Sequence, residues 1–402
     1  MLGEFWGEIL AAIASAGTVL GGAYTTVKWY RRRHSSVVYF KYYCEHSFFY
    51  FKSFVNKLVH KSISRPLPDG RYINYALAIK NRFYAKDVTS VQLRFLSKVI
   101  LYQLPYKEEI DYIASPDSRI FIKNPVLYER FELSEELRNL TDPILENFIS
   151  EKPNTTDGPA LRMQSFFKLD DYKYQCNLQL ASYFDQVRTN LTLDVPIQFD
   201  ETVRIADLGK DRSVRDLSES IMANTIGVSA VWFIEDRNGD KNNRLRFFLR
   251  PRRKTTGVFT DMLGTISGVV EPPANNVFTE GTLEEYMIKE IRREFYQETG
   301  YDLYMRDNSL TEDDVTIIPL AFMRELTRGG KPQFFFAITT PYVTEREMSK
   351  YFKLSYNGRE EFYSDIRSRF MMYKLSPETM VNLMLTYKFI QRKQNLEYID
   401  FS

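Results

Sequence analysis

The stretch that decides the fold is LEEYMIKEIRREFYQETGYDL, residues 283–303. Its apolar residues recur at the spacing of one helical face, at Leu283, Tyr286, Met287, Ile291 and Phe295. Gly300 follows the last of them, where a glycine in the left-handed conformation commonly ends a helix. The pattern therefore predicts an amphipathic helix that ends at Gly300.

Apolar segments on both sides of this helix predict strands. Upstream, GVSAVWFIED (227–236) and RLRFFLRPR (244–252) flank an Asn238–Gly239 pair, which is a strong signal for a hairpin. Downstream, PQFFFAITTP (332–341) is a further apolar run of strand length. The second half of the chain is therefore expected to combine strands with at least one long helix.

The polar face of the predicted helix carries acidic residues in register. Glu294 and Glu298 are one helical turn apart, so their side chains point the same way. Two neighbouring carboxylates repel each other, which leaves two interpretations. They are either a solvated polar face or the ligands of a hard cation, whose charge offsets the repulsion.

Residues 293–301, REFYQETGY, resemble the signature of the Nudix family, which is G-x5-E-x7-R-E-U-x-E-E-x-G-U with U an apolar residue. Glu285 fills the acidic position that precedes Arg293 by seven intervening residues. Two positions depart from the signature: Gln297 replaces a glutamate, and Gly268 lies about eleven residues too far upstream. The resemblance implies a Nudix-like α/β/α sandwich over residues 156–402.

The same resemblance implies roles for the residues of this signature, which we call the box. Glu294 and Glu298 would hold magnesium (Mg) or manganese (Mn) against a diphosphate linkage, Arg293 would orient a carboxylate, and Glu285 would assist from outside. Gln297 offers a neutral amide where the family has an anion, which weakens the hold on a divalent cation. Hydrolysis would then be either slow or lost.

Further residues are candidates for contact with the ligand. Arg250, Arg252 and Arg253 lie between the hairpin and the box, a position that suits them to bind phosphate oxygens; alternatively they form a solvated strand end. Gly268 and Gln297 belong to the same predicted nucleotide site. Glu325 is a candidate additional carboxylate, because the family takes such a residue from outside the box.

The N-terminal segment predicts a membrane span. Residues 9–27 contain no charge, and the 23 steps from Trp6 to Trp29 correspond to about 35 Å of helix. Basic residues follow, which predicts a single-pass protein of the cell inner membrane with its C-terminal domains cytoplasmic. The alternative is a buried helix of a soluble domain. Gly17 and Gly21 form a G-x-x-x-G, a motif that favours a homo-oligomer in the lipid bilayer but also arises by chance.

The middle of the chain has less specific patterns. Residues 36–60 suit an amphipathic helix, residues 70–130 alternate as strands do, and EKPNTTDGP (151–159) has the composition of a linker. We therefore predict three parts: a transmembrane helix with a basic flank (1–34), an amphipathic helix with a β-rich module (35–155), and the Nudix-like domain (156–402). The fold class is α+β or α/β.

Composition excludes several functions. The formal charge of +2 comes from 54 basic and 52 acidic side chains, so no nucleic acid duplex is expected as a partner. The three histidines all lie in the first 60 residues, which leaves the rest of the chain without histidine catalysis or histidine metal ligation. Neither a phosphate-binding P-loop motif nor a G-x-S-x-G motif is present.

These features favour two functions from different classes. A membrane helix joined to a Nudix-like domain is similar to the effectors of bacterial antiphage systems that signal with cyclic oligonucleotides (CBASS). In that case the domain binds the nucleotide, and the chain oligomerises and disrupts the membrane in antiviral defence. The alternative is a membrane-tethered, Mg-dependent hydrolase of a nucleoside diphosphate derivative. A scaffold that binds no small ligand is the third interpretation.

Overall fold

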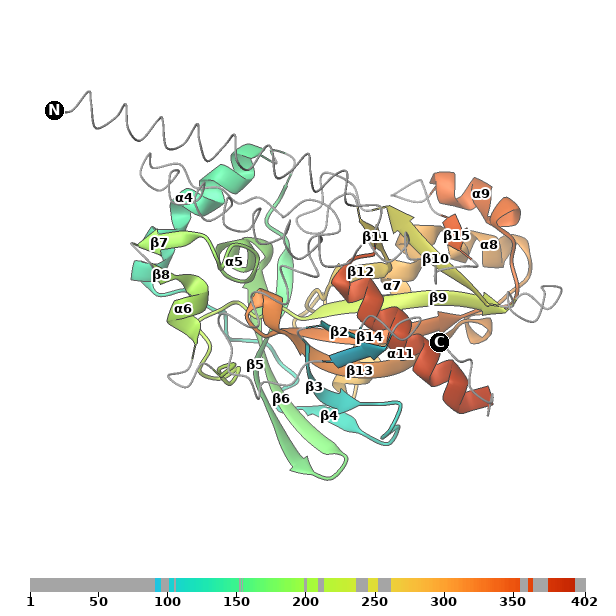
Figure 1. Cartoon of the computed structure of the whole chain (residues 1–402), viewed down its shortest axis with the longest axis horizontal. Helices are drawn as coiled ribbons and strands as arrows, with labels where there is room; N and C mark the ends of the chain where they lie inside the picture. Colours follow the sequence, from blue (N-terminus) through green and yellow to red (C-terminus); the bar gives the residue numbers. More distant parts are fainter. Residues whose placement is uncertain are drawn as a thin grey trace. The chain divides into compact units, whose positions relative to one another are not determined.

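The structure is a computed structural model that describes residues 91–94, 101–104, 106–151, 153, 155–198, 201–208, 213–235, 245–251, 262–354, 361–363 and 375–394. The chain divides into two compact units, Met1–Ser62 and Ile63–Ser402. All described residues belong to the second unit, which has a mixed α/β fold (Figure 1).

A mixed sheet forms the centre of this unit. Its strands run in the order β11-β10-β9-β14-β13-β3, with β12 also paired to β9 and β15 to β10. Strands β9 and β14 are parallel, and the other pairs are antiparallel. The strand bounds are β3 Tyr106–Asp111, β9 Gly227–Glu235, β10 Leu245–Pro251, β11 Leu263–Gly264, β12 Ile266–Val269, β13 Thr316–Glu325, β14 Lys331–Thr339 and β15 Glu361–Tyr363.

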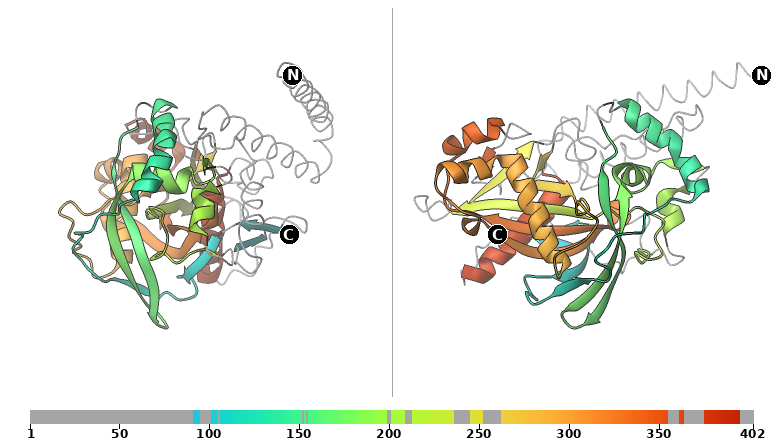
Figure 2. Two further views of the ribbon diagram at one scale, coloured as in Figure 1. Left: turned by 90° about the vertical axis from the view of Figure 1, so that its left-hand side faces the viewer. Right: turned by 180° about the vertical axis from the view of Figure 1, so that it is seen from behind.

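Helices cover both faces of this sheet. On one face, Val228, Ala230 and Trp232 of β9 join the core that contains helix α7 (Leu283–Thr299). On the other face, Val231 and Phe233, which alternate with these residues, join the core that contains α11 (Pro377–Gln394). Alternate residues of a strand point to opposite faces, so β9 is buried on both sides. Helix α11 lies in front of the sheet in Figure 1, and the gold α7 lies in front of it in the reverse view of Figure 2.

Helix α7 is the predicted amphipathic helix, and its two ends explain its length. Thr282 and Glu285 form a capping box, in which the Glu285 carboxylate accepts a hydrogen bond from the backbone N–H of Thr282 at 3.1 Å. At the other end Gly300 has φ +68° and donates its N–H to Tyr296 O at 2.8 Å. The prediction of a helix that ends at Gly300 is confirmed.

The strands predicted around α7 are also present. Strands β9 and β10 pair antiparallel, as the hairpin pattern predicted, and β14 covers the predicted downstream run. The Asn238–Gly239 turn lies outside the described residues.

A second sheet has the order β4-β6-β5. Its strands are β4 (Arg119–Ile122), β5 (Pro159–Asp170) and β6 (Lys173–Ser182). One face packs on the core shared with α7, where the ring of Phe166 lies edge-on to that of Phe322 at 4.9 Å between centroids. Strands from before and after residues 151–159 thus pair within one sheet. Within the middle segment, β1 (Val91–Arg94) and β2 (Leu101–Leu104) also pair, antiparallel.

Smaller elements hold the turn between β13 and β14. Arg204 donates hydrogen bonds to Leu326 O at 2.8 Å and to Thr327 O at 2.6 Å, and Asn190 donates to Arg328 O at 2.9 Å. The turn, η3 (Leu326–Arg328), is therefore fixed by residues far upstream in the chain. The remaining elements are α4 Glu135–Glu151, α5 Tyr183–Gln186, η1 Val187–Leu191, β7 Pro196–Gln198, β8 Glu201–Thr202, α6 Val203–Asp207, α8 Tyr301–Asp307, η2 Glu312–Asp314 and α9 Glu345–Leu354.

The membrane architecture predicted from the sequence needs correction. In the part of the chain that the structure describes, no helix is both long enough and apolar enough to cross a bilayer. Even α11, with 18 residues, carries charges at Glu378, Lys388 and Arg392, whereas a span needs about 20 mostly apolar residues. This finding contradicts the single-pass transmembrane fold and the inner-membrane location, and we carry neither forward.

Several predictions concern residues that the structure does not describe. They are the span at 9–27 with its Gly17 and Gly21 stripe, and the amphipathic helix at 36–60. Alanine and glycine make 9–27 only moderately apolar, so a lack of charge was weak evidence for a span. The fold that is described is mixed α/β.

Candidate functional site

The polar side of α7 carries a cluster of charged residues centred on Arg293. Its Nη2 lies 3.0 Å from Glu290 Oε2, 3.0 Å from Glu294 Oε1 and 3.7 Å from a Glu271 oxygen. Its Nη1 donates a hydrogen bond to Gln297 Oε1 at 3.1 Å. Together with an adjacent ion pair these residues form what we call the box cluster: Arg250, Glu271, Glu290, Arg293, Glu294, Gln297 and Glu298.

The adjacent ion pair joins Glu298 to Arg250 of β10. Arg250 Nη2 donates a hydrogen bond to Glu298 Oε1, and the two side chains are only 13% and 6% exposed. A charge-assisted contact at this depth is stronger than one on the surface. The carboxylate of Glu298 is therefore balanced by a cation of the protein itself.

Glu294 lies against the backbone of β12. A Cβ added to Gly268 would lie 2.5 Å from Glu294 Oε1, so only glycine leaves room for the carboxylate in this position. Burial raises the pKa of the Glu294 carboxyl, and the neighbouring Arg293 and Arg250 only partly oppose that rise. The structure thus brings Gly268 and Glu294 together.

Replacing Gly268 by alanine should displace Glu294 without unfolding the protein. The atoms in the way belong to the end of a flexible side chain, so we expect the free energy of unfolding to fall by less than about 1.5 kcal/mol. The displaced carboxylate would lose its contact with Arg293, which should be visible as a shift of the Glu294 carboxyl resonance in an NMR titration. An unchanged titration of Glu294 would contradict this placement.

The carboxylates of the box do not fit a resident metal ion as they stand. Oxygen ligands suit magnesium and manganese, but one oxygen of Glu294 contacts Arg293 and one oxygen of Glu298 contacts Arg250. Among the described residues no group of three or more His, Cys, Asp or Glu side chains is arranged to hold a metal ion. We therefore assign no metal to the box cluster and derive no chemical step through one.

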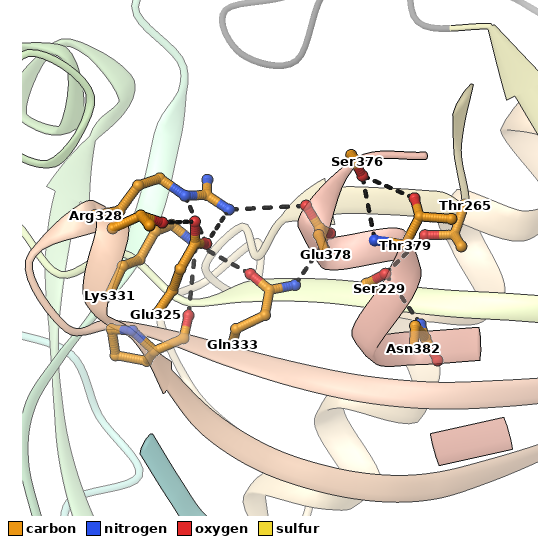
Figure 3. Close-up of polar contacts among 12 residues, drawn as sticks. Ser229, Thr265, Glu325, Arg328, Lys331, Gln333, Ser376, Glu378, Thr379 and Asn382 are labelled. Atoms are coloured by element: carbon orange, nitrogen blue, oxygen red, sulfur yellow. Dashed lines mark hydrogen bonds and ion pairs between the residues drawn. The ribbon is translucent and has the colours of Figure 1, made fainter. Parts of the chain in front are cut away.

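Two predicted site residues lie away from the box cluster. Glu285 caps the start of α7, and 13 residues at 1.5 Å each separate it from Glu298 by roughly 20 Å along the helix axis. Glu325 is fully buried at the end of β13, where it contacts Arg328, and Arg328 contacts Glu378 of α11 (Figure 3). Glu325 therefore lies on the α11 face of the sheet, opposite the box helix.

Glu325 belongs to a second group of charged side chains, which we call the interior network: Glu325, Arg328, Lys331, Gln333 and Glu378. Arg328 Nε donates to Glu325 Oε2 at 2.7 Å, and Arg328 Nη2 lies 3.7 Å from Glu378 Oε2. Gln333 Nε2 donates to Glu378 Oε1 at 3.3 Å and links the strand to α11 (Figure 3). All five residues are at least nine-tenths buried.

Lys331 is the most unusual member of the interior network. It is 1% exposed, and among the described residues its Nζ makes two long contacts, 3.4 Å to Pro332 O and 3.5 Å to Gln333 Oε1. Burial and the nearby Arg328 lower its pKa to about 7, although Glu325 and Glu378 act in the opposite direction. By contrast, Arg328 holds the pKa of Glu325 below its ordinary value, outweighing the effect of burial.

The sequence missed part of both groups. Glu290 joins the box cluster, and its place one helical turn before Glu294 could have identified it. Glu271 enters from the loop after β12, and Lys331 and Gln333 precede the apolar run of β14 at the start of that strand. No local pattern marks these three residues. Two predicted ligand residues, Arg252 and Arg253, lie outside the described residues.

The box cluster combines two arginines, Arg250 of β10 and the partly exposed Arg293 of α7, with three carboxylates of α7 and that of Glu271 from the loop after β12. In comparisons with known proteins, no family model and no curated protein sequence matches this chain. The assignment of a function therefore depends on the residues of the chain itself.

Proposed function

We propose that this protein is a nucleotide receptor that holds a diphosphate-containing or cyclic nucleotide at the box cluster without cleaving it. The support is the resemblance of residues 293–301 to the Nudix box, together with the arginines that the fold adds to it. Arg293 has a side chain that is 32% exposed, so it remains open to solvent and to a ligand. Guanidinium groups bind phosphate oxygens in a bidentate manner.

The observation that carries the proposal is the pairing of both box carboxylates with arginines. Glu298 contacts Arg250, and Glu294 contacts Arg293. Gln297 removes the third carboxylate that the family signature places here. Hydrolysis through a metal needs carboxylates that are open to the ion, so these contacts favour binding over turnover.

One observation favours the alternative, a Mg-dependent hydrolase. The box cluster contains four carboxylates, those of Glu271, Glu290, Glu294 and Glu298, against two arginines. Four negative and two positive charges leave a net charge of −2, which repels a polyphosphate unless a cation accompanies it. A nucleotide that arrives as its magnesium complex would restore the balance.

The test separates these two functions in the full-length protein. ADP-ribose and cyclic di-AMP are titrated by calorimetry, with magnesium and then with EDTA, while phosphate and monophosphate release is measured. We expect binding in the micromolar range, worth about 8 kcal/mol, without release of product. Magnesium-dependent release that Glu298→Gln abolishes would instead establish the hydrolase.

Variants connect binding to the box cluster. The double variant Arg250→Gln/Glu298→Gln removes both charges of the buried pair, so neither member of the pair is left charged without the other, and the variant should keep the fold. It should weaken nucleotide binding at least tenfold. Arg306→Ala, which removes a 71% exposed cation on α8, is the matched control and should bind as the wild type does. The antiviral role stays a prediction that no observation on this chain tests.

A further inference from the structure

The outward face of the β4-β6-β5 sheet carries two exposed phenylalanines in one row. The strand registers place Phe121 of β4 beside Gln175 of β6, and Gln175 beside Phe167 of β5. Phe121 is 37% exposed and Phe167 is 40% exposed, so both are among the large apolar side chains that remain exposed in the described part of the chain. The row therefore presents two aromatic rings with an amide between them.

The alternation of the strands explains why these residues face outward. Their neighbours Ile120, Tyr174 and Phe166 point to the other side, where they belong to or pack against the core shared with α7. The projecting β5–β6 hairpin at the bottom of Figure 1 carries part of this face away from the central sheet. The sheet is thus half-buried, and its outer face is held rigidly by the packing of its inner face.

Cations border the aromatic row on both sides. On the side nearer the tip of the β5–β6 hairpin, Arg119 of β4 pairs with Lys173 of β6. On the side away from the tip, Lys123 follows the end of β4, and its backbone N–H donates a hydrogen bond to Cys176 O at 2.9 Å. Arg119 Nη1 donates hydrogen bonds to Pro116 O at 2.7 Å and to Ser118 O at 2.8 Å, which leaves its other guanidinium nitrogens for a phosphate. In the two rows Arg119–Lys173–Asp170 and Phe121–Gln175–Phe167, Asp170 is the one carboxylate. The face is locally basic although the whole chain is nearly neutral.

We propose that this face, which we call the platform, binds single-stranded nucleic acid. Bases stack on Phe121 and Phe167, and Arg119, Lys123 and Lys173 contact the phosphates. Stacking on aromatic side chains combined with a basic surface is the general chemistry by which proteins hold unpaired strands. The base faces of a duplex are already stacked on one another, so the platform does not bind a duplex. This inference is independent of the function proposed for the box cluster.

An anionic lipid surface is the competing partner for an exposed aromatic and basic face. The tip of the β5–β6 hairpin would reach such a surface first, and it carries Asp170 and Asp171 beside the exposed Leu169 and Tyr172. Lys168 forms an ion pair with Asp171, so the carboxylate of Asp170 is the group there that opposes contact with anionic headgroups. The rings of Phe121 and Phe167 lie on the flat face behind the tip, where an extended strand can reach them.

The test uses the full-length protein and three fluorescent probes: a 12-nucleotide oligo-U RNA, a 12-nucleotide oligo-dT DNA and a 12-base-pair duplex. Binding is measured by anisotropy at low and at moderate salt. We expect one or both single strands to bind with a dissociation constant below about 100 µM, more weakly as salt rises, and the duplex to bind much more weakly. The two single strands distinguish RNA from DNA as the natural ligand.

Variants assign the binding to the platform. Phe121→Ala and Phe167→Ala should each raise the dissociation constant about tenfold, and the double variant about a hundredfold. Lys123→Glu/Lys173→Glu keeps both rings and should also weaken binding while reducing its salt dependence. Tyr128→Ala removes an 83% exposed ring outside the platform and should change nothing. Circular dichroism melts establish that each variant is folded.

Several outcomes would overturn the inference. They are the absence of single-strand binding at 100 µM protein, equal binding of the duplex, and wild-type affinity in the folded double phenylalanine or double lysine variant. Binding to vesicles of anionic lipid that the phenylalanine variants abolish, without binding of either oligonucleotide, would assign the face to a membrane instead.

Discussion

Arg328→Met is expected to lower the free energy of unfolding by about 3–5 kcal/mol. Arg328 contacts Glu325 and Glu378, and the side-chain exposures of the three residues are 9%, 0% and 5%. Removing the guanidinium leaves two carboxylates buried beside each other without their main cation. The protein then either solvates them by local opening or protonates one of them, and both responses reduce stability.

Chemical denaturation with urea measures this effect through the midpoint and slope of the transition. Arg306→Met, on the surface of α8, is the matched control and should change the unfolding free energy by less than about 0.5 kcal/mol. The double variant Glu325→Gln/Arg328→Met removes one charge of each sign and should recover part of the loss. A single-variant loss below about 1 kcal/mol would show that Arg328 does not stabilise these buried carboxylates.

The features that the sequence predicted correctly are those with a local signal. Helix α7 has apolar residues at helical spacing and a terminal Gly300, and each signal acts within one or two turns. Strands β9, β10 and β14 are apolar runs of the right length. These patterns depend on short-range geometry, so they can be recognised in the sequence without knowing which elements pack together.

The placement of Glu325 shows where local patterns end. Phe322 of β13 faces the α7 core, whereas Ala321 and Met323 face the α11 core. Strand alternation therefore puts Glu325, two residues after Met323, on the face away from the box helix. The sequence contains this alternation, but which face meets α7 depends on packing between segments far apart in the chain. The same holds for the contact of Gly268 with Glu294.

The stability of the protein should rise between pH 7 and pH 8.5 because of Lys331. Its pKa is about 7 in the folded protein, lowered first by burial and then by Arg328, against about 10.4 for an unfolded lysine. Between these two values the unfolded chain binds the proton and the folded protein does not. The free energy of unfolding therefore increases with pH in this window, and it decreases as pH falls toward 7 because the unfolded state gains the proton more readily.

The expected gain from pH 7 to pH 8.5 is roughly 1.5–2 kcal/mol, since each pH unit above the folded pKa contributes about 1.4 kcal/mol. The window ends at 8.5 because Cys176 acts in the opposite direction beyond it. Burial raises the pKa of that thiol, so the folded protein keeps a proton that the unfolded chain loses at higher pH. Urea denaturation at closely spaced pH values measures the slope.

Comparison with Lys331→Met isolates the contribution of this one amine, because every other titrating group is common to both proteins. The variant replaces the buried amine by an apolar side chain of similar length, so its unfolding free energy should lose most of the slope between pH 7 and 8.5. Lys353→Met, an exposed lysine of α9, should keep the wild-type slope. Equal slopes in the wild type and Lys331→Met would mean that Lys331 stays protonated in the folded protein. Glu325 and Glu378 would then outweigh the burial of the amine, and the interior network would be neutral at physiological pH with two cations against two carboxylates.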